Sequence, residues 1–189
     1  MPSIFSKVGT AKIRPDANWI RPCTFIAMIT KCKIEQNRKK LDRCFVEMKV
    51  VRVVDPREHE NGGNPHRVGE EVTKAFQPEN DYFDSEILAF ICCCAGVNPD
   101  SATEQERVDA ATLVFGSENP LAGTFVLVEA RTIMTKGDAT KKPAPFTKVS
   151  FKREVAPNEL AEWFADRQDE KKLLFPNDEL DTLVAAQAA

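Results

Sequence analysis

The chain has few of the residues that build most catalytic sites. Its 189 residues include two histidines, one tyrosine and eight glycines. It contains no glycine-rich phosphate loop, no Gly-x-Ser-x-Gly elbow and no His-Glu-x-x-His motif. Both histidines, His59 and His66, fall in a turn-rich segment, where we expect a flexible loop that offers no rigid position for histidine catalysis. We therefore expect a protein that is not an enzyme, and an enzyme acting on nucleic acid is the least supported alternative.

Long apolar segments are also missing. The longest uncharged apolar run, residues 87–96, is far shorter than the roughly 20 residues that cross a bilayer. Residues 1–10 lack the apolar core of a signal peptide, and no Asn-x-Ser/Thr sequon occurs. These absences predict a soluble, cytoplasmic protein with no membrane partner.

The six cysteines include no Cys-x-x-Cys pair. Three of them, Cys92 to Cys94, are consecutive within an apolar stretch, which predicts buried thiols in a helix that act as small hydrophobic residues. A disulfide framework is not expected in a cytoplasmic chain of this size. Without clustered Cys and His ligands we also expect no metal site and no cofactor.

Hydrophobic periodicity predicts five strands and three helices. Alternating or β-branched runs place the strands at residues 23–34, 43–54, 69–76, 123–134 and 146–155. In the second strand Cys44, Val46, Met48 and Val50 share one face, and the pattern slips at Val51, which suits a β-bulge.

The predicted helices lie between the third and fourth strands and at the C-terminus. The first covers residues 83–94 and ends at Gly96, a suitable residue for a helix C-terminus. A capping-box pattern from Ser101 to Glu104 opens the second, whose expected apolar face is Val108, Ala111 and Phe115. Asn158 is the expected cap of the third, over residues 159–174, with Leu160, Trp163 and Phe164 on its apolar side.

This order of elements is that of a mainly β, five-stranded OB-fold, a small Greek-key β-barrel with helices between strands 3 and 4. A β-sandwich would have more strands, and a doubly wound α/β fold would alternate strands with helices. We expect an N-terminal arm at residues 1–22, the OB-fold domain at residues 23–155, and a C-terminal helix with an acidic, Ala-rich tail at residues 156–189.

Positive charge is concentrated in two segments of a chain whose net charge is −3. Residues 31–52 hold eight Lys or Arg residues and three acidic residues. Residues 131–153 hold seven Lys or Arg residues and one acidic residue. They form the first and last hairpins of the predicted barrel, whose loops bind oligonucleotides or oligosaccharides in OB-folds. Either hairpin alone could be a solvated surface that resists aggregation. Two together favour one shared groove that binds phosphates.

Aromatic residues among these cations support the groove. Phe45, Phe125 and Phe146 are expected to point outward beside basic residues, and Trp19 lies in a basic part of the arm. An exposed ring can stack on an unpaired base, although each ring could instead belong to the core. The predicted nucleic-acid-binding residues are Lys31, Lys33, Arg38, Lys39, Lys40, Arg43, Phe45, Lys49, Arg131, Lys136, Lys141, Lys142, Phe146, Lys148, Lys152 and Trp19.

Several segments together carry a family resemblance: FVEMKVVRVV, RVGEEVTKAF, DYFDSEILAFICCCAG, ENPLAGTFVLVEARTIMTKGD and FTKVSFKRE. Across residues 23–155 the chain resembles the small OB-fold single-stranded DNA-binding proteins of tailed bacteriophages. In that family Pro-Leu-Ala-Gly opens the fourth strand, and a Thr-Lys-Gly loop followed by Phe-Thr opens the fifth. The resemblance implies that the protein coats single-stranded DNA during phage replication or recombination, in the host cytoplasm and without catalysis.

The C-terminal region leaves an alternative open. Residues 154–189 hold nine acids and three bases but end in Ala-Ala-Gln-Ala-Ala. Many single-strand binders recruit replication or recombination proteins through an acidic tail with a terminal aromatic, which is missing here. The alternative function is that of a phage adaptor whose acidic C-terminal helix and tail bind a host or replication protein.

Overall fold

A computed structural model describes residues 19–36, 39–79, 82–115, 119, 121–136 and 142–188. The strands are β1 (Cys23–Gln36), β2 (Asp42–Asp55), β3 (Glu71–Phe76), β4 (Phe125–Met134) and β5 (Pro145–Val155). The helices are α2 (Glu58–Asn61), α3 (Phe83–Cys94), α4 (Glu104–Phe115), α5 (Pro157–Trp163), α6 (Gln168–Leu174) and α7 (Glu179–Ala188). All five predicted strands are present.

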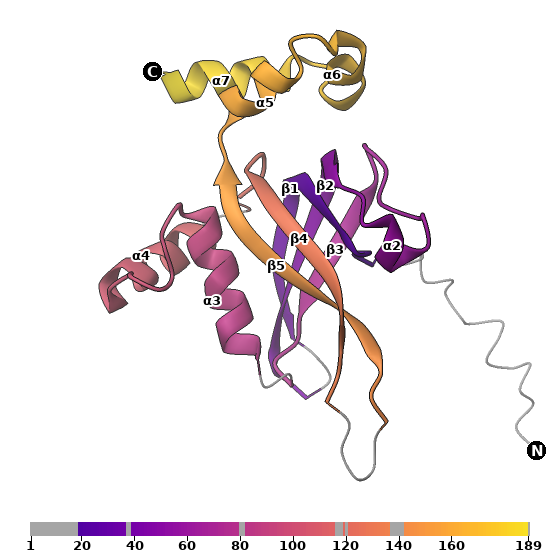
Figure 1. Cartoon of the computed structure of the whole chain (residues 1–189). Helices are drawn as coiled ribbons and strands as arrows, with labels where there is room; N and C mark the ends of the chain where they lie inside the picture. The colour runs from indigo at the N-terminus through magenta and orange to yellow at the C-terminus, as the bar shows by residue number, and fades with distance from the viewer. Residues whose placement is uncertain are drawn as a thin grey trace, which may run out of the picture.

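The strands form one antiparallel sheet in the order β3-β2-β1-β4-β5 (Figure 1). The long strand β1 holds the sheet together, because it pairs with β2 along most of its length and with β4 over its first half. Within the described ranges β3 and β5 are not paired with each other, so the sheet is open. The protein is thus mixed α/β with an open sheet, and the closed barrel that we predicted is not confirmed.

Helix α3 lies against both open edges of this sheet. The ring of Phe90 is 5.4 Å from that of Phe76 on β3 and 4.8 Å from that of Phe151 on β5, centroid to centroid. Lys74 Nζ on β3 donates to Glu86 Oε2 on α3 at 2.8 Å. These contacts bring the edge strands together around a helix instead of through a ladder of backbone hydrogen bonds.

The alternation predicted for β2 is confirmed. Cys44, Val46, Met48 and Val50 are all buried, and they contribute to the larger apolar core, on the inner face of the curled sheet. The pairing shifts between Ala27↔Val50 and Ile26↔Arg52, which leaves Val51 as the bulged residue. Val51 is buried on the other side of the sheet, as alternation after Val50 requires, and because the bulge reverses the faces of the residues that follow, Val53 packs against the inner core again.

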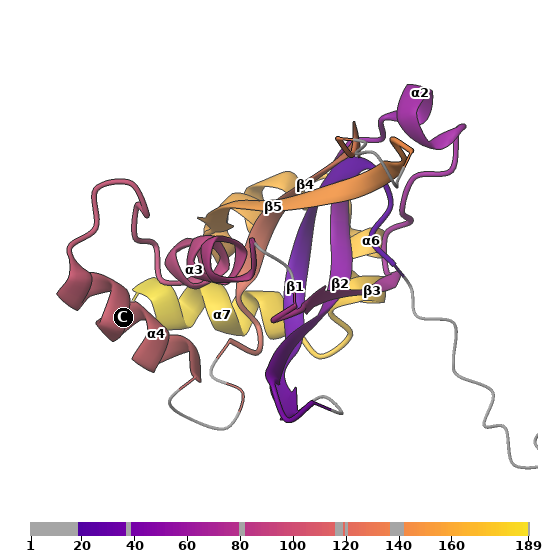
Figure 2. The same ribbon diagram turned by 90° about the horizontal axis from the view of Figure 1, so that it is seen from below.

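The C-terminal helices cover one end of the opposite face of the sheet, at the top of Figure 1 and behind the sheet in Figure 2. Ile26, Val51, Phe125 and Val155 from the strands pack there against buried side chains from α5 to α7 and their connections, namely Leu160, Phe164, Leu174, Phe175 and Leu180. The prediction that Phe125 points outward beside cations is therefore wrong. Alternation gave its face correctly, but that face carries a second layer, in which Phe125 is only 1% exposed.

The single C-terminal helix predicted over residues 159–174 is two helices. The chain leaves the helix after Trp163 and re-enters it at Gln168, with the N–H of Arg167 donating to the carbonyl of Phe164 at 2.9 Å. Asn158 is not the cap, because α5 begins one residue earlier with Pro157, a residue favoured in the first helical turn. The Ala-rich tail, for which we predicted no element, forms α7.

Helix α3 matches its prediction at both its core residues and its end. Cys92, Cys93 and Cys94 are buried, and all six cysteines are free thiols. Gly96 adopts a left-handed φ of 66°, its N–H donates to the carbonyl of Cys93, and the N–H of Val97 donates to that of Cys92. This is the hydrogen-bond pattern of a Schellman helix end.

The cap of helix α4 is Thr103, two residues later than the expected Ser101. Thr103 and Glu106 form the capping box: the Glu106 carboxylate accepts from the Thr103 N–H at 2.7 Å, and the Glu106 N–H donates to Thr103 Oγ1 at 3.3 Å. The buried face of the helix is Ala110 and Val114, while Val108 is 52% exposed, so its assignment to the apolar face is wrong. In the described part of the chain no helix is long and apolar enough to cross a membrane.

His66 is held rigidly, contrary to the expectation of a flexible loop. Its side chain is fully buried; Nε2 accepts from the backbone N–H of Arg21 at 2.8 Å, and Nδ1 lies 3.2 Å from Glu70 Oε2. Arg21 in turn donates to both Glu70 oxygens at 2.6 Å. Since Nε2 is an acceptor here, the ring is neutral with its proton on Nδ1, and it ties the segment before β1 to the loop before β3.

Burial lowers the pKa of His66 below its usual 6.5, against the opposing effect of Glu70. The unfolded chain therefore takes up a proton before the folded one does. We expect the unfolding free energy to fall as pH drops below about 6.5, by at most about 1.4 kcal/mol per pH unit. Denaturant titrations between about pH 7.5 and 5 measure this slope. His66→Gln should flatten it, whereas His59→Gln, at an exposed position, should not; equal slopes for His66→Gln and wild type would contradict the assignment.

Candidate nucleic-acid interface

The outer face of the β4–β5 ladder carries a mixture of cations and apolar side chains. In the register of these strands Arg131 lies opposite Lys148, and Ile133 lies opposite Phe146. Residues directly opposite each other in an antiparallel pair share a face, so these four side chains form one surface. Lys152 extends it toward the C-terminal helices, beyond a shift in the pairing.

A hollow of about 690 Å³ lies between this surface and the first turn of α3. Two aromatic side chains line it, Tyr82 and Phe146, which are 70% and 45% exposed. Lys136 and Lys148 line the same hollow, and Met134 adds a third exposed apolar side chain. Exposed rings and lysines thus meet at one recess, and three of these residues, Lys136, Phe146 and Lys148, are among the predicted binding residues.

Tyr82 is a site residue that sequence reasoning missed. It lies at the N-cap position of α3, in a segment whose hydrophobic pattern predicts only a helix. Its neighbour across the hollow, Phe146, is 64 positions further along the chain, and no local spacing joins the two. The one available signal was that Tyr82, the only tyrosine, falls just before the apolar period of α3 begins.

A second, smaller hollow of about 330 Å³ follows along the same face, over Arg131, Lys148 and Lys152. Here Glu129 offsets part of the positive charge, since it contacts Lys152 at 2.8 Å, Arg57 at 2.9 Å and the Arg131 guanidinium. Hydrogen bonds from Lys152 and then Arg131 lower the pKa of Glu129 to about 2, so this carboxylate stays ionised. Lys148 has no such acidic neighbour within 4 Å among the described residues.

Part of the positive charge of the β1–β2 hairpin is paired with acidic residues of the same hairpin. Lys33 pairs with Glu47 at 3.1 Å and Glu35 at 3.2 Å, and its ammonium lies 5.7 Å from the centre of the Phe45 ring. Phe45 is half-buried, so it is less available for stacking than Phe146. Lys49 Nζ donates to the carbonyl of Leu174 at 3.0 Å, and a phosphate would have to displace that bond.

The remaining predicted residues are spread over the surface. Trp19 is 64% exposed and bridges to Thr73 on β3. Arg43 is half-buried. The other predicted residues, Lys31, Lys39, Lys40 and Lys142, are exposed cations that do not line the large hollow. Arg38 and Lys141 lie outside the described residues.

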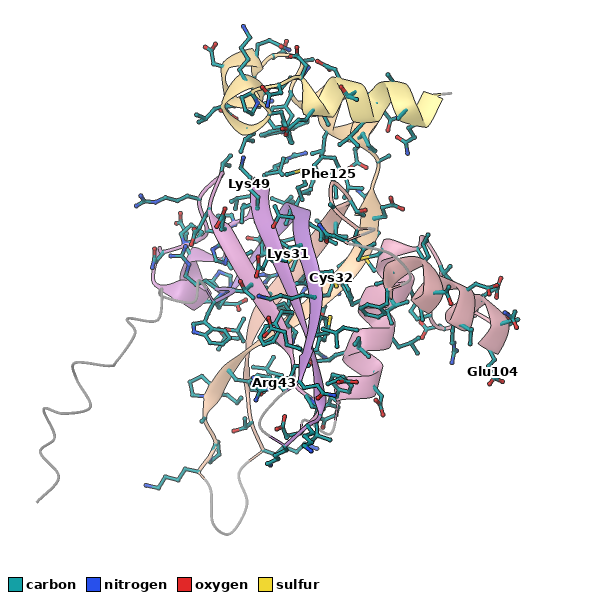
Figure 3. The ribbon with its side chains drawn as sticks, turned by 180° about the vertical axis from the view of Figure 1, so that it is seen from behind. Lys31, Cys32, Arg43, Lys49, Glu104 and Phe125 are labelled. Atoms are coloured by element: carbon teal, nitrogen blue, oxygen red, sulfur yellow. The ribbon has the colours of Figure 1, made fainter. Side chains whose placement is uncertain are left out.

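The two basic hairpins extend toward the same end of the molecule, at the bottom of Figure 1, because β1 bends sharply. Figure 2, which looks onto that end, shows them on opposite sides of it. Figure 3 places Lys31 and Arg43 on the descending part of β1 and β2, well below Lys49. The large hollow has no lining residue from β1 or β2. The hairpins therefore do not form the two walls of one narrow groove, and the candidate site is centred on β4, β5 and the start of α3.

No known protein family model and no curated protein sequence matches this chain.

Proposed function

We propose that this protein binds single-stranded DNA without sequence preference and without catalysing a reaction on it. The observation that carries the proposal is the large hollow, where two exposed rings, Tyr82 and Phe146, lie together with Lys136 and Lys148. Aromatic platforms beside cations are what sequence-tolerant single-strand binders use, since every base has a face that can stack.

The roles follow from the chemistry of each group. Lys136 and Lys148 hold phosphates, and Arg131 and Lys152 extend the cationic track along the outer face of β4 and β5. Tyr82 and Phe146 stack on unpaired bases, each worth about 1–3 kcal/mol. In a duplex the base faces are stacked on one another, so only the phosphate contacts would remain and single strands are preferred.

A finer description of the fold supports this proposal. We infer that β1 to β5 form an OB-type barrel opened between β3 and β5. The order β3-β2-β1-β4-β5 is that of a five-stranded barrel of this type lacking only the closing pair, and OB-folds are commonly partly open. The rings of Phe76 and Phe151, 6.1 Å apart, bridge the opening. The last hairpin of such barrels is one of the loops that bind oligonucleotides.

The experiment that tests the function is a salt titration of binding to a poly-dT oligonucleotide, with duplex DNA and RNA of equal length alongside. If Lys136, Lys148, Arg131 and Lys152 each neutralise one phosphate, the slope of log affinity against log salt is about −3. Affinity then falls roughly 50-fold between about 50 and 200 mM salt. A salt-insensitive affinity, or equal affinity for duplex, would contradict the proposal.

The second candidate is the adaptor. One observation favours it: Leu173, on the acidic C-terminal segment, is 79% exposed. Deleting this segment would not separate the two functions, because α5 to α7 cover Ile26, Val51 and Phe125 and their loss would expose a core. The point variant Leu173→Glu does separate them. A DNA binder keeps its DNA affinity, whereas an adaptor loses its protein partner.

A further inference from the structure

Two cysteine side chains of the inner core lie next to each other near the end of the β1–β2 hairpin. Cys32 on β1 and Cys44 on β2 have their Sγ atoms 3.8 Å apart, within hydrogen-bond distance for sulfur. They occupy diagonal positions on adjacent strands, since Cys32 lies opposite Val46 and Cys44 lies opposite Ile34. A disulfide requires about 2.05 Å between the sulfurs and spans at most about 7 Å between Cα atoms, whereas diagonal positions lie about 7–8 Å apart, so joining the two thiols requires rotation of the side chains and a shift of the strands. Their place near the end of the hairpin favours such an adjustment.

The two thiols differ in their surroundings. Cys44 is only 2% exposed, whereas Cys32 is half-buried at the edge of the core. The hydrogen bond between the two thiols lowers the pKa of Cys32, while that bond and burial raise the pKa of Cys44. The other four cysteines, Cys23, Cys92, Cys93 and Cys94, are all buried, and burial raises the pKa of each. Cys32 is thus the accessible, more acidic thiol, with a second thiol next to it.

We propose that Cys32 and Cys44 form a reversible dithiol–disulfide pair that reacts with small disulfides of the glutathione type. The Cys32 thiolate attacks one sulfur of the oxidised disulfide, which forms a mixed disulfide and releases one thiolate. Cys44 then gives up its proton and attacks Cys32 Sγ; the protein disulfide forms and the second glutathione thiol leaves. The protein loses two protons and two electrons, and the oxidised disulfide becomes two thiols. This chemistry is independent of DNA binding.

The test is to treat the folded protein with oxidised glutathione, block remaining thiols by alkylation, and map the tryptic peptides. Trypsin cleaves after Lys31, Lys33, Arg43 and Lys49, which separates Cys-Lys from Cys-Phe-Val-Glu-Met-Lys unless a disulfide joins them. We expect that linked pair in the oxidised sample and its loss after dithiothreitol. All six cysteines alkylated after treatment, or a link from Cys32 to Cys94, would overturn the proposal.

Two single variants check the order of the steps. Cys44→Ser should stop at the mixed disulfide and carry one glutathione on Cys32, because the resolving thiol is absent. Cys32→Ser should acquire neither the link nor the adduct at Cys44. A glutathione adduct on Cys44 in that variant would show that Cys44 is the attacking thiol and would contradict the assignment. The control Cys93→Ser should still form the Cys32–Cys44 link. The peptide map of the wild-type protein tests the proposal even if a variant does not fold.

Discussion

The double variant Lys136→Glu/Lys148→Glu is expected to bind a single-stranded oligonucleotide about 100- to 10,000-fold more weakly than the wild type. Hydrogen bonds to charged groups are worth about 1.5–3 kcal/mol each, and about 1.4 kcal/mol corresponds to a tenfold change in affinity. Both lysines line the large hollow and are exposed, so their loss leaves the fold intact. Fluorescence anisotropy with a labelled poly-dT oligonucleotide measures the change.

The matched control is Lys172→Glu, an exposed lysine on α6 at the opposite end of the molecule from the β4–β5 hairpin (Figure 1). It lowers the net charge by two, half of the change in the double variant, so it measures how strongly net charge alone affects binding. We expect its affinity to stay within a few-fold of wild type. If Lys172→Glu and the double variant weakened binding equally, long-range charge and not the hollow would explain binding.

The variant Phe90→Ala is expected to lower the unfolding free energy by about 3–5 kcal/mol. Its fully buried ring contacts Phe76 and Phe151 and so joins α3 to both edges of the open sheet. In a chain of this length each kcal/mol lowers Tm by about 2–4 °C, so a fall of roughly 6–20 °C is expected. Thermal unfolding followed by circular dichroism measures it.

The same substitution at Phe146 should give the opposite combination of effects. Phe146 is 45% exposed, so Phe146→Ala should change stability by less than about 1 kcal/mol. It should nevertheless weaken single-strand binding by about 1–3 kcal/mol, the value of one stacked base. A Phe146→Ala variant that is destabilised as much as Phe90→Ala would place the ring in the core and remove it from the site.

The strands and their faces were predictable because side chains alternate between the two faces of a strand with a period of two. This pattern depends only on residues that are close in the sequence. The faces of β2 and the bulge at Val51 follow from that rule alone. What alternation does not reveal is whether a face meets solvent or a second layer. Phe125 was wrongly placed for this reason, since the helices that bury it lie more than 30 residues further along the chain.

The cap of α4 and the break between α5 and α6 could not be predicted, because the local sequence fits more than one position for each. Both Ser101–Glu104 and Thr103–Glu106 fit a capping box; the second one forms, in a helix that buries Ala110 and Val114. The break after Trp163 lets Phe164, Leu174 and Phe175 all reach the second core, a tertiary requirement that helical periodicity does not contain.

The candidate site was predictable only in part. Charge counting found Lys136 and Lys148, and alternation found Phe146 on the same face. Tyr82 joins them only through the tertiary placement of α3. The partial neutralisation of the Arg131 charge by Glu129 was predictable from the sequence. The two residues are two positions apart in a strand, so they share one face and pair there.

The most direct test of the account is photo-crosslinking of a single-stranded oligonucleotide containing 5-iodouracil, followed by mapping of the modified peptide. We predict crosslinks at Tyr82 and Phe146, and their loss at high salt and in Lys136→Glu/Lys148→Glu. Crosslinks confined to α4 or α7, with none at the β4–β5 hairpin or at the start of α3, would contradict it.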